Sequence, residues 1–253
     1  MTQRDLRGTT AIVTGASRGF GRATATALIG AGARVVGVAR DRTRLEETRG
    51  ELGDAFIPVA TDAADPVVAG QLLDRYHPDT VVLSAGASPL LRPLQQQTWE
   101  TFGRHWDVDV RQVFNWIREA LLLPLAPGSV VIAFSSGAAI AGSAVSGGYA
   151  GAKATIRFIS SYGAEESKRG GLGIKVVSVL PDLTGDTEMG APVIAAYARR
   201  AGMEAADLVA QRRWTLTAAE TGKAVLELAT DSGRDRDAYR ITPDGLAPLP
   251  GAA

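Results

Sequence analysis

The fold is decided by the stretch Val130-Val-Ile-Ala-Phe-Ser135-Ser136-Gly137-Ala-Ala-Ile-Ala-Gly142-Ser-Ala-Val-Ser-Gly147-Gly148-Tyr149-Ala-Gly-Ala-Lys153. The short, wholly apolar run at its start is typical of a strand buried on both faces of a parallel sheet. Two hydroxyl side chains follow this run, and a loop of small residues then leads into a predicted helix that carries Tyr149 and Lys153. The stretch therefore predicts a strand, a loop and a helix that carries polar chemistry.

The pair Tyr149 and Lys153 is a candidate for proton transfer. Residues four apart lie on one face of a helix, so both side chains can reach one small ligand. A tyrosine hydroxyl ordinarily titrates near ~10, and a nearby ammonium favours the phenolate. A hydroxyl at the end of the strand, such as that of Ser136, can hold the oxygen of a reacting group. An exposed pair on an amphipathic helix is the competing interpretation, which the N-terminal sequence must decide.

Composition limits the class of protein. The 253 residues suffice for one large α/β domain, and we expect a single domain over residues 1–253. Acidic and basic residues balance, so no nucleic-acid or membrane partner is expected. The chain has no cysteine and only His77 and His105 as imidazoles, so we expect no metal site and ordinary roles for both histidines. The first seven residues lack the apolar core of a signal peptide, which predicts a cytoplasmic protein.

A glycine-rich turn follows the first predicted strand, Thr10–Thr14. The sequence Gly15-Ala-Ser-Arg-Gly19-Phe-Gly21 leads directly into a helical stretch at residues 22–31. A strand, a glycine turn and a helix N-terminus together aim backbone N–H groups at a phosphate. Gly15 would allow the tight turn, Gly19 the approach of a pyrophosphate, and Gly21 close packing of helix and strand. The turn predicts a dinucleotide site, to which Ser17, Arg18 and Phe20 also contribute.

The second predicted strand, residues 34–39, indicates which dinucleotide binds. A free ribose 2′-hydroxyl favours an acid at the end of this strand, whereas a 2′-phosphate favours a cation. Ala39 stands where the acid is expected, and Arg40 follows it. Arg18 in the glycine turn adds a second cation. NADP(H) is therefore favoured over NAD(H), although Asp41 could take the role of the acid if the strand ran longer.

The rest of the chain alternates predicted strands and helices. Apolar strands at 55–59, 80–83, 130–134, 174–180 and 238–242, with helices at 43–52, 67–76, 98–123 and 218–230, predict a Rossmann-like, doubly wound parallel sheet. Ligands of such sheets sit off the carboxyl ends of the strands, where Gly15, Ser84, Ser136 and Pro181 fall. Residues 182–215 are predicted to form a small lid over this crevice. Met189, Tyr197, Met203 and Trp214 are candidate walls of a pocket there, and the tail from Leu246 is predicted to be extended and mobile.

These motifs make the chain similar to the short-chain dehydrogenase/reductase (SDR) superfamily over nearly its whole length. The motifs are Thr14-Gly-x-x-x-Gly-x-Gly21, Asp62, Ser135-Ser136 and Tyr149-x-x-x-Lys153, in family order. The resemblance implies that Tyr149 donates or accepts the proton of a carbonyl/alcohol pair. It further implies that Lys153 lowers the pKa of that tyrosine and binds the nicotinamide ribose, and that Ser136 holds the substrate oxygen. A homotetramer or homodimer built through the long helices is also implied.

The chain departs from the family pattern at several positions. The usual Asn-Ala-Gly is Ser84-Ala85-Gly86, and the relay asparagine of the long helix aligns with Asp109. A carboxylate there would stabilise the ammonium of Lys153 but weaken its effect on Tyr149. The usual Pro-Gly is Pro181-Asp182, and the following threonine is Thr187. The resemblance implies cofactor contacts at Gly15, Ser17, Arg18, Gly19, Phe20, Gly21, Arg40, Asp62, Ala63, Ser84, Ala85, Gly86, Tyr149, Lys153, Pro181 and Thr187.

The sequence supports one leading function and two alternatives. The leading one is an NADP(H)-dependent oxidoreductase that interconverts a carbonyl and an alcohol on a small to medium, rather apolar substrate. A cofactor-binding sensor or scaffold with weak or no catalysis is the first alternative, and Asp109 and Asp182 favour it. An SDR-type lyase or epimerase that uses Tyr149 for proton transfer is the second.

Overall fold

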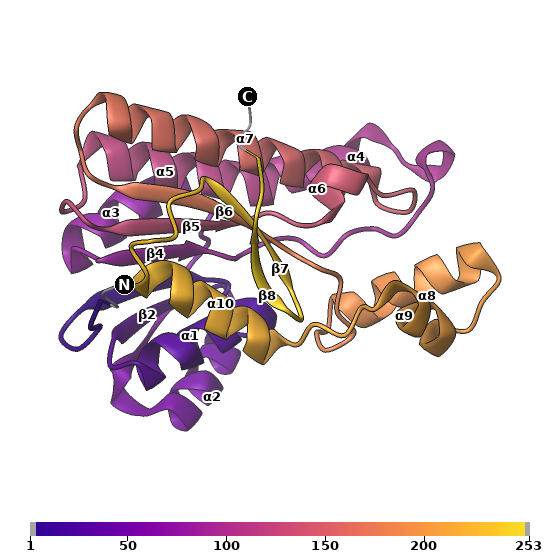
Figure 1. Ribbon diagram of the computed structural model, residues 1–253, viewed down its shortest axis with the longest axis horizontal. Coiled ribbons are helices and arrows are strands. Elements are labelled where there is room, and N and C mark those ends of the chain that lie inside the picture. The colour runs from indigo at the N-terminus through magenta and orange to yellow at the C-terminus, as the bar shows by residue number, and fades with distance from the viewer. Residues whose placement is uncertain (1–3, 251–253) are drawn as a thin grey trace.

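A single eight-stranded sheet forms the centre of the protein, in a computed structural model that describes residues 4–250 (Figure 1). The strand order is β3-β2-β1-β4-β5-β6-β7-β8, and all neighbours are parallel except β7 and β8. The predicted doubly wound α/β fold is therefore confirmed. The strands are β1 (Thr10–Thr14), β2 (Arg34–Ala39), β3 (Phe56–Ala60), β4 (Thr80–Leu83), β5 (Val130–Phe134), β6 (Lys175–Pro181), β7 (Ala238–Thr242) and β8 (Gly245–Pro248).

Helices cover both faces of the sheet. Helices α1, α2 and α10 lie on one side and α3, α5 and α7 on the other (Figure 1). The helices are α1 (Gly19–Gly30), α2 (Arg42–Leu52), α3 (Pro66–Tyr76), α4 (Trp99–His105), α5 (Arg111–Leu122), α6 (Ala138–Ala141), α7 (Gly147–Arg169), α8 (Gly190–Ala201), α9 (Ala205–Arg212) and α10 (Ala218–Thr230). Short 3-10 turns occupy Gly53–Ala55 and Leu94–Gln96.

Each face of the sheet has its own apolar core. Leu28 of α1 and Leu228 of α10 are buried on one face, while Trp116 of α5 and Ile156 of α7 are buried on the other. Because both faces are covered, the central strands are mostly apolar, and every residue of β5 is apolar and buried. The strand order reverses between β1 and β4, which places a crevice at their carboxyl ends.

The sheet extends one strand beyond the sequence prediction. The turn at Gly245 has a φ of 108°, and residues 245–248 return as β8, antiparallel to β7. The tail was expected to be extended and mobile from Leu246, but its first part is a strand that covers the open edge of β7. The described residues do not include the last part of that expected tail, residues 251–253. They also do not include residues 1–3, the start of the segment in which no signal peptide was predicted.

The long helix predicted at 98–123 is divided into three parts. Thr98 begins it with a capping box to Thr101, and α4 runs to His105. A π-helical turn, η3 (Trp106–Val110), follows, and α5 continues to Leu122. Short π-helical turns inside α-helices occur often at functional sites. Here the turn contains Asp109, the residue that aligns with the relay asparagine of the SDR family.

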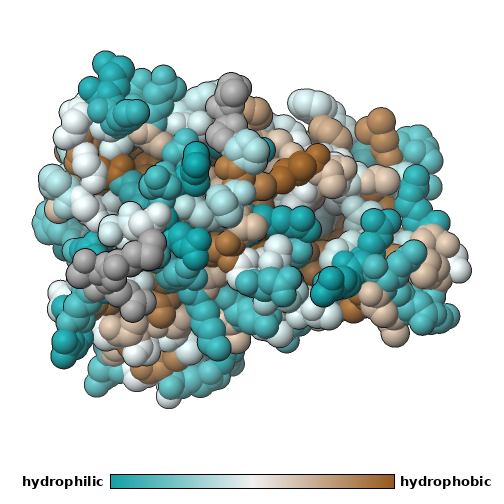
Figure 2. All heavy atoms as spheres, in the orientation of Figure 1, coloured by the Kyte–Doolittle hydropathy of each residue, from teal (hydrophilic) through white to brown (hydrophobic). Residues whose placement is uncertain are grey.

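The outer surface mixes polar and apolar side chains. Apolar residues form separate patches among polar ones on the face seen in Figure 2. Within residues 4–250, no helix is both long enough and apolar enough to cross a bilayer.

Candidate active site

The glycine turn between β1 and α1 adopts a conformation that side chains would prevent. Gly15 has a φ of 68°, and a Cβ there would lie 2.8 Å from the backbone of Ala85. A Cβ on Gly21 would clash with the carbonyl oxygen of Gly15. Helix α1 has no side-chain cap and no acidic residue in its first turn. Its free N–H groups therefore face the crevice, as an anion site requires.

A groove of about 420 Å³ follows this turn along the carboxyl edge of the sheet. It contains most of the predicted cofactor contacts. These are Gly15, Ser17, Arg18, Gly19, Phe20, Gly21, Arg40, Asp62, Ala63, Ser84, Ala85, Gly86 and Thr187. Arg44, Gln112 and Glu188 also line the groove, and sequence reasoning missed all three.

The end of β2 presents cations to the groove. The strand ends at Ala39, as predicted, and the exposed Arg40 follows it. Asp41 is the N-cap of α2, where its Oδ1 accepts a hydrogen bond from the Arg44 backbone N–H at 3.1 Å. Because the strand does not run longer, Asp41 serves the helix and does not take the place of a ribose-binding acid at the strand end.

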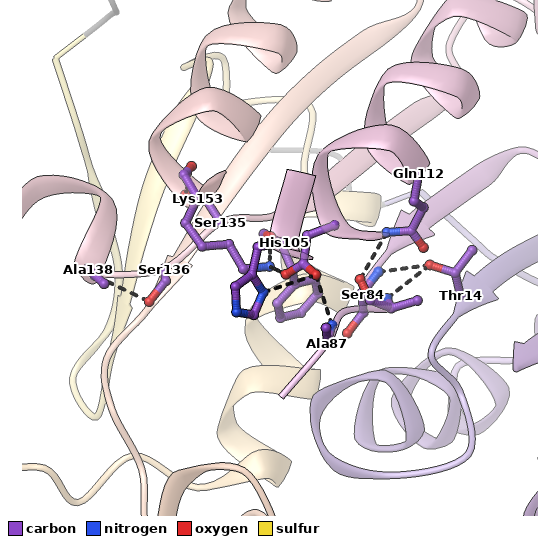
Figure 3. A network of polar contacts seen from close by, with 12 residues as sticks. Thr14, Ser84, Ala87, His105, Gln112, Ser135, Ser136, Ala138 and Lys153 are labelled. Atoms are coloured by element: carbon purple, nitrogen blue, oxygen red, sulfur yellow. Dashed lines mark hydrogen bonds and ion pairs between the residues drawn. The ribbon is translucent and has the colours of Figure 1, made fainter. Parts of the chain in front are cut away.

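Side chains of α5 hold the two loops on the other side of the groove. Trp116 donates its indole N–H to the carbonyl oxygen of Ala63 at 2.9 Å, and Asn115 donates to that of Ala64 at 3.2 Å. Gln112 donates to the carbonyl oxygen of Ala85 at 3.0 Å (Figure 3). Asn115 thus supports the loop between β3 and α3.

Thr14 fixes the loop after β4 against the glycine turn. Its hydroxyl accepts hydrogen bonds from the backbone N–H groups of Ser84 at 3.0 Å and Ala85 at 3.2 Å (Figure 3). These contacts hold Ser84-Ala85-Gly86 beside Gly15, at the point where the strand order reverses. The small residues there leave room for a ligand between the strand ends.

The two hydroxyl side chains after β5, those of Ser135 and Ser136, make different contacts. Ser135 is buried and donates to the backbone carbonyl of Lys153 at 2.7 Å, which fastens α7 to the end of β5. Within residues 4–250, the one hydrogen bond of the Ser136 hydroxyl is the one it accepts from the N–H of Ala138, at 3.2 Å (Figure 3). Ser136 also lines a cavity with Tyr149 and Lys153. Ser136 can therefore offer its hydroxyl to a ligand, whereas Ser135 cannot.

Lys153 is buried and held from two sides. Its Nζ donates to the carbonyl oxygen of Phe134 at 3.1 Å and lies 3.1 Å from Oδ2 of Asp109. Burial alone would lower the pKa of Lys153, but the charge of Asp109, the nearby Tyr149 and the hydrogen bond to Asp109 together outweigh it and raise that pKa. Burial alone would likewise raise the pKa of Asp109, and the ammonium, with His105 and the N–H of Ala87, lowers it instead. The two groups form a buried ion pair.

His105 belongs to the same cluster, which sequence reasoning missed. It is 2% exposed, its Nδ1 lies 3.5 Å from Oδ1 of Asp109, and its ring meets the Tyr149 ring edge-on at 5.3 Å (Figure 3). An ordinary polar or half-buried side chain was expected at this position, whereas the structure buries His105 between Asp109 and Tyr149. The spacing of four residues to Asp109 was the signal available in the sequence.

Glycines on α7 bring the segment that carries His105 close to Tyr149. A Cβ on Gly148 would clash with the carbonyl oxygen of Phe102, and one on Gly151 would lie 2.8 Å from the Trp106 ring. The absence of both side chains lets the α4 segment rest directly on α7. This close approach places the imidazole of His105 against the phenol ring of Tyr149.

A second cavity of about 1000 Å³ adjoins the groove and shares Phe20, Ser84, Gly86, Thr187 and Met189 with it. Its walls include Ser136, Tyr149, Lys153, Asp109 and Pro181, so the remaining predicted site residues meet here. Met189, Tyr197 and Trp214 line it as expected. Met203 does not, and its side chain is exposed.

The segment over this cavity is fastened at both ends. Thr184 donates its hydroxyl to the carbonyl of Leu216, and Asp186 accepts from the Ala218 N–H at 2.8 Å. Asp182, which stands where the family has glycine, pairs with Arg240 of β7 at 2.6 Å. Helices α8 and α9 lie between these fastenings. Within residues 4–250, no cluster of three His, Asp or Glu side chains could hold a metal ion.

Comparisons with known proteins agree with this geometry. The sequence model of the family described as short chain dehydrogenase matches residues 9–198. Mouse (Mus musculus) L-xylulose reductase is 34% identical over 129 residues, which cover 50% of this chain and 52% of that protein. A probable NADP-dependent dehydrogenase of Haemophilus influenzae is 31% identical over 190 residues, covering 72% of this chain and 74% of the relative. The chain thus spans about half the length of the first curated relatives that it matches.

Solved structures share the whole fold. A short chain dehydrogenase from Burkholderia cenocepacia in complex with NADP superposes with a TM-score of 0.78 at 25% identity, covering 94% of this chain and 97% of the other. A 3-ketoacyl-(acyl-carrier-protein) reductase from Brucella melitensis, complexed with NADH, has a TM-score of 0.75 at 22% identity, covering 93% and 97%. The second likeness concerns the fold alone.

Proposed function

This chain belongs to the short-chain dehydrogenase family of oxidoreductases, and from that premise we propose that it is an NADP(H)-dependent enzyme that interconverts a carbonyl and an alcohol. One observation carries the proposal. Tyr149, Lys153 and Ser136 line a cavity that adjoins a groove built for a dinucleotide. The uncapped start of α1, together with the space that glycine leaves at positions 15 and 21, supports a pyrophosphate there.

Three arginines support the preference for NADP(H). Arg18, Arg40 and Arg44 line the same groove, and a 2′-phosphate needs such cations, whereas a free ribose hydroxyl needs an acid. Asp41 also lines the groove, but its carboxylate caps α2. The Haemophilus influenzae relative is described as NADP-dependent and the Burkholderia cenocepacia structure contains NADP, in line with this preference. NAD(H) remains the alternative cofactor.

Three side chains would carry out the proton chemistry. Ser136 holds the carbonyl oxygen, and Tyr149 gives its phenolic proton to that oxygen as the carbonyl is reduced, or takes it back in the reverse direction. Lys153 lies with its Nζ 5.4 Å from the centre of the Tyr149 ring, where its charge stabilises the phenolate that remains. The nicotinamide cofactor supplies or accepts the hydride when bound.

The cavity supports a small to medium, rather apolar substrate. Ile140, Leu183, Val193, Tyr197 and Trp214 form much of its lining. We assign the lid role to residues 182–215, because this segment carries four of these side chains, Leu183, Val193, Tyr197 and Trp214. Tyr197 of α8 shares a hydrogen bond of 2.6 Å with Ser143, in the loop before α7, so the lid contacts the segment that leads to Tyr149.

A cofactor titration followed by a carbonyl screen tests the proposal. NADPH should bind more tightly than NADH by fluorescence titration, and at least one apolar ketone or aldehyde should oxidise NADPH. Failure of both cofactors to bind would contradict the proposal. Tight NADPH binding with no turnover across a broad carbonyl panel would favour the rival function, a cofactor-binding sensor. The ion pair of Asp109 with Lys153 favours that rival, because it offsets the positive charge beside Tyr149.

A homo-oligomer built through α5 and α7 completes the proposal. Phe114 of α5 is 52% exposed, and Phe158 and Tyr162 of α7 are 44% and 60% exposed. Exposed aromatic side chains grouped on two helices are typical of an interface. Light scattering should give a dimer or tetramer, and Phe114→Glu combined with Phe158→Glu should dissociate it. A monomeric wild-type protein would contradict this part.

A further inference from the structure

Two arginines from separate segments converge on one carboxylate at the rim of the groove. Arg18 lies in the glycine turn, Arg44 in the first turn of α2, and Glu188 between β6 and α8. The Arg18 Nη1 donates to Glu188 Oε2 at 2.7 Å, and the Arg44 Nη1 lies 2.9 and 3.1 Å from its two carboxylate oxygens. The side chains of Arg18 and Glu188 are separated by 170 positions in sequence, so only the fold brings them together.

The arrangement is that of an anion site. Two guanidinium groups that point at one set of oxygens can bind a phosphate as well as a carboxylate. The hydrogen bonds from Arg18 and Arg44 lower the pKa of Glu188, so the bound group is an anion at neutral pH. Arg40, which lines the same groove, makes no ion pair within residues 4–250. The groove thus contains three arginines, and two of them, Arg18 and Arg44, are paired with Glu188 of the same groove.

Glu188 also lies in the first part of the lid, next to both the groove and α8. It follows Thr187, which lines both the groove and the adjoining cavity, and it lies two residues before Gly190, the first residue of α8. Its ion pairs tie the start of the lid to α1 and α2 on the far side of the groove. A ligand that removed these ion pairs would free that side of the lid.

We propose that the 2′-phosphate of NADP(H) competes with Glu188 for Arg18 and Arg44, so that NADP(H), and not NAD(H), releases the start of the lid from the cofactor groove. The inference rests on the proposed NADP(H) dependence and adds two assignments to it. Arg44 is a specificity-determining residue, and Glu188 is an internal competitor of the phosphate. Two anions at the pair of guanidinium groups repel each other, and this repulsion favours the exchange.

Nucleotides that differ only in the 2′-phosphate test the competition. Calorimetry measures the binding of 2′,5′-ADP and 5′-AMP to the wild-type protein, to Glu188→Gln and to the control variant Glu204→Gln. The control changes an exposed glutamate of the lid that lies outside both cavities. Glu188→Gln should bind 2′,5′-ADP about threefold more tightly than wild type at low salt, with 5′-AMP and the control unchanged. The gain should shrink as salt screens the competing charge.

Two outcomes would overturn the inference. An unchanged ratio of the 2′,5′-ADP and 5′-AMP affinities would show that Glu188 does not compete. Weaker binding of both nucleotides to Glu188→Gln would show that Glu188 holds nucleotides in the groove. In either case the proposed NADP(H) dependence stands, because 2′,5′-ADP still binds. Failure of both nucleotides to bind any of the three proteins would instead contradict the proposed function and this inference with it.

Hydrogen exchange tests the release of the lid without any turnover. Saturating 2′,5′-ADP should speed exchange of the backbone amides of residues 185–195 in wild type, while 5′-AMP should not. In Glu188→Gln these amides should already exchange faster, and 2′,5′-ADP should add little. Equal exchange in wild type with and without 2′,5′-ADP would overturn the link to the lid.

Discussion

The Nζ of Lys153 lies 3.1 Å from Oδ2 of Asp109, and both side chains are buried. The carboxylate therefore offsets the charge on which the proposed proton transfer by Tyr149 depends, at a position where the resemblance to the SDR family implies an uncharged amide. Asp109 also accepts the N–H of Ala87 at 2.8 Å, so it fixes the loop after β4 as well. We therefore expect substitution of Asp109 to change both the stability and the proposed turnover.

Asp109→Asn should lower the free energy of unfolding by about 2–4 kcal/mol at neutral pH, because it leaves a buried ammonium without its counter-ion. The pKa of Asp109 is lowered in the folded protein, so its contribution is present above the ordinary carboxyl pKa of ~3.9 and is lost as pH falls through the lowered value. The pKa of Lys153 is raised, so its contribution is present below ~10.4 and is lost as pH rises through the raised value. Urea denaturation across pH should show the largest difference between variant and wild type between these limits. A difference that grows on acidification would contradict the ion pair.

The same substitution should raise turnover or shift its pH optimum, and His105 should matter only while Asp109 is charged. In wild type, His105→Phe should lower kcat because the carboxylate then faces Lys153 alone. In the Asp109→Asn background the same change should have little effect, with a coupling of about 0.5–3 kcal/mol. Measurements of kcat and KM against pH complete the cycle, with exposed His77→Asn as control. An equal decrease in kcat on His105→Phe in wild type and in Asp109→Asn would show that His105 acts through packing alone.

Tyr149→Phe should lower hydride turnover by about a hundredfold or more, because it removes the proton that reaches the substrate oxygen. NADPH affinity should stay close to that of wild type. Tyr162→Phe changes an exposed tyrosine of the same helix and should leave kcat unchanged. Stopped-flow absorbance and a fluorescence titration give both quantities. Full activity in Tyr149→Phe would remove this residue from the mechanism.

Arg40→Ala should weaken NADPH by about tenfold while NADH changes little, because a hydrogen-bonded phosphate loses one charged partner. The neighbouring Arg42 is exposed and does not line the groove, so Arg42→Ala is the matched control. Dissociation constants for both cofactors, measured by fluorescence, decide the outcome. A parallel loss for NADPH and NADH would count against the 2′-phosphate contact.

Much of the sheet could be predicted because its strands are buried on both faces. The strands Thr10–Thr14, Arg34–Ala39 and Thr80–Leu83 were predicted with the bounds that the structure shows, since polar or glycine residues end each apolar run. The strand Gly245–Pro248 was missed, because a run of Gly, Leu, Ala and Pro has weak strand propensity. It forms because β7 offers it a free edge, which is a tertiary effect.

In the site too, contacts between residues close in sequence could be predicted, whereas contacts between distant segments could not. Spacing along one helix predicted the Tyr149 and Lys153 pair, and the structure places both in one cavity wall. The contact of Arg44 with Glu188 spans 144 positions, so no local pattern could reveal it. His105 was overlooked for another reason. Its partner Asp109 is local, but burial against the ring of Tyr149 depends on the glycines of α7.

The fastening of Thr184 to Leu216 and of Asp186 to Ala218 joins the two ends of the lid to each other. The residues from 189 to 215 can therefore be exchanged for the corresponding segment of a relative while these anchors, Thr187 and Glu188 stay intact. We expect such a chimaera to take on the substrate preference of the donor and to keep the cofactor preference of this chain. The protein accordingly offers a scaffold on which selectivity can be re-engineered by grafting one continuous piece of chain.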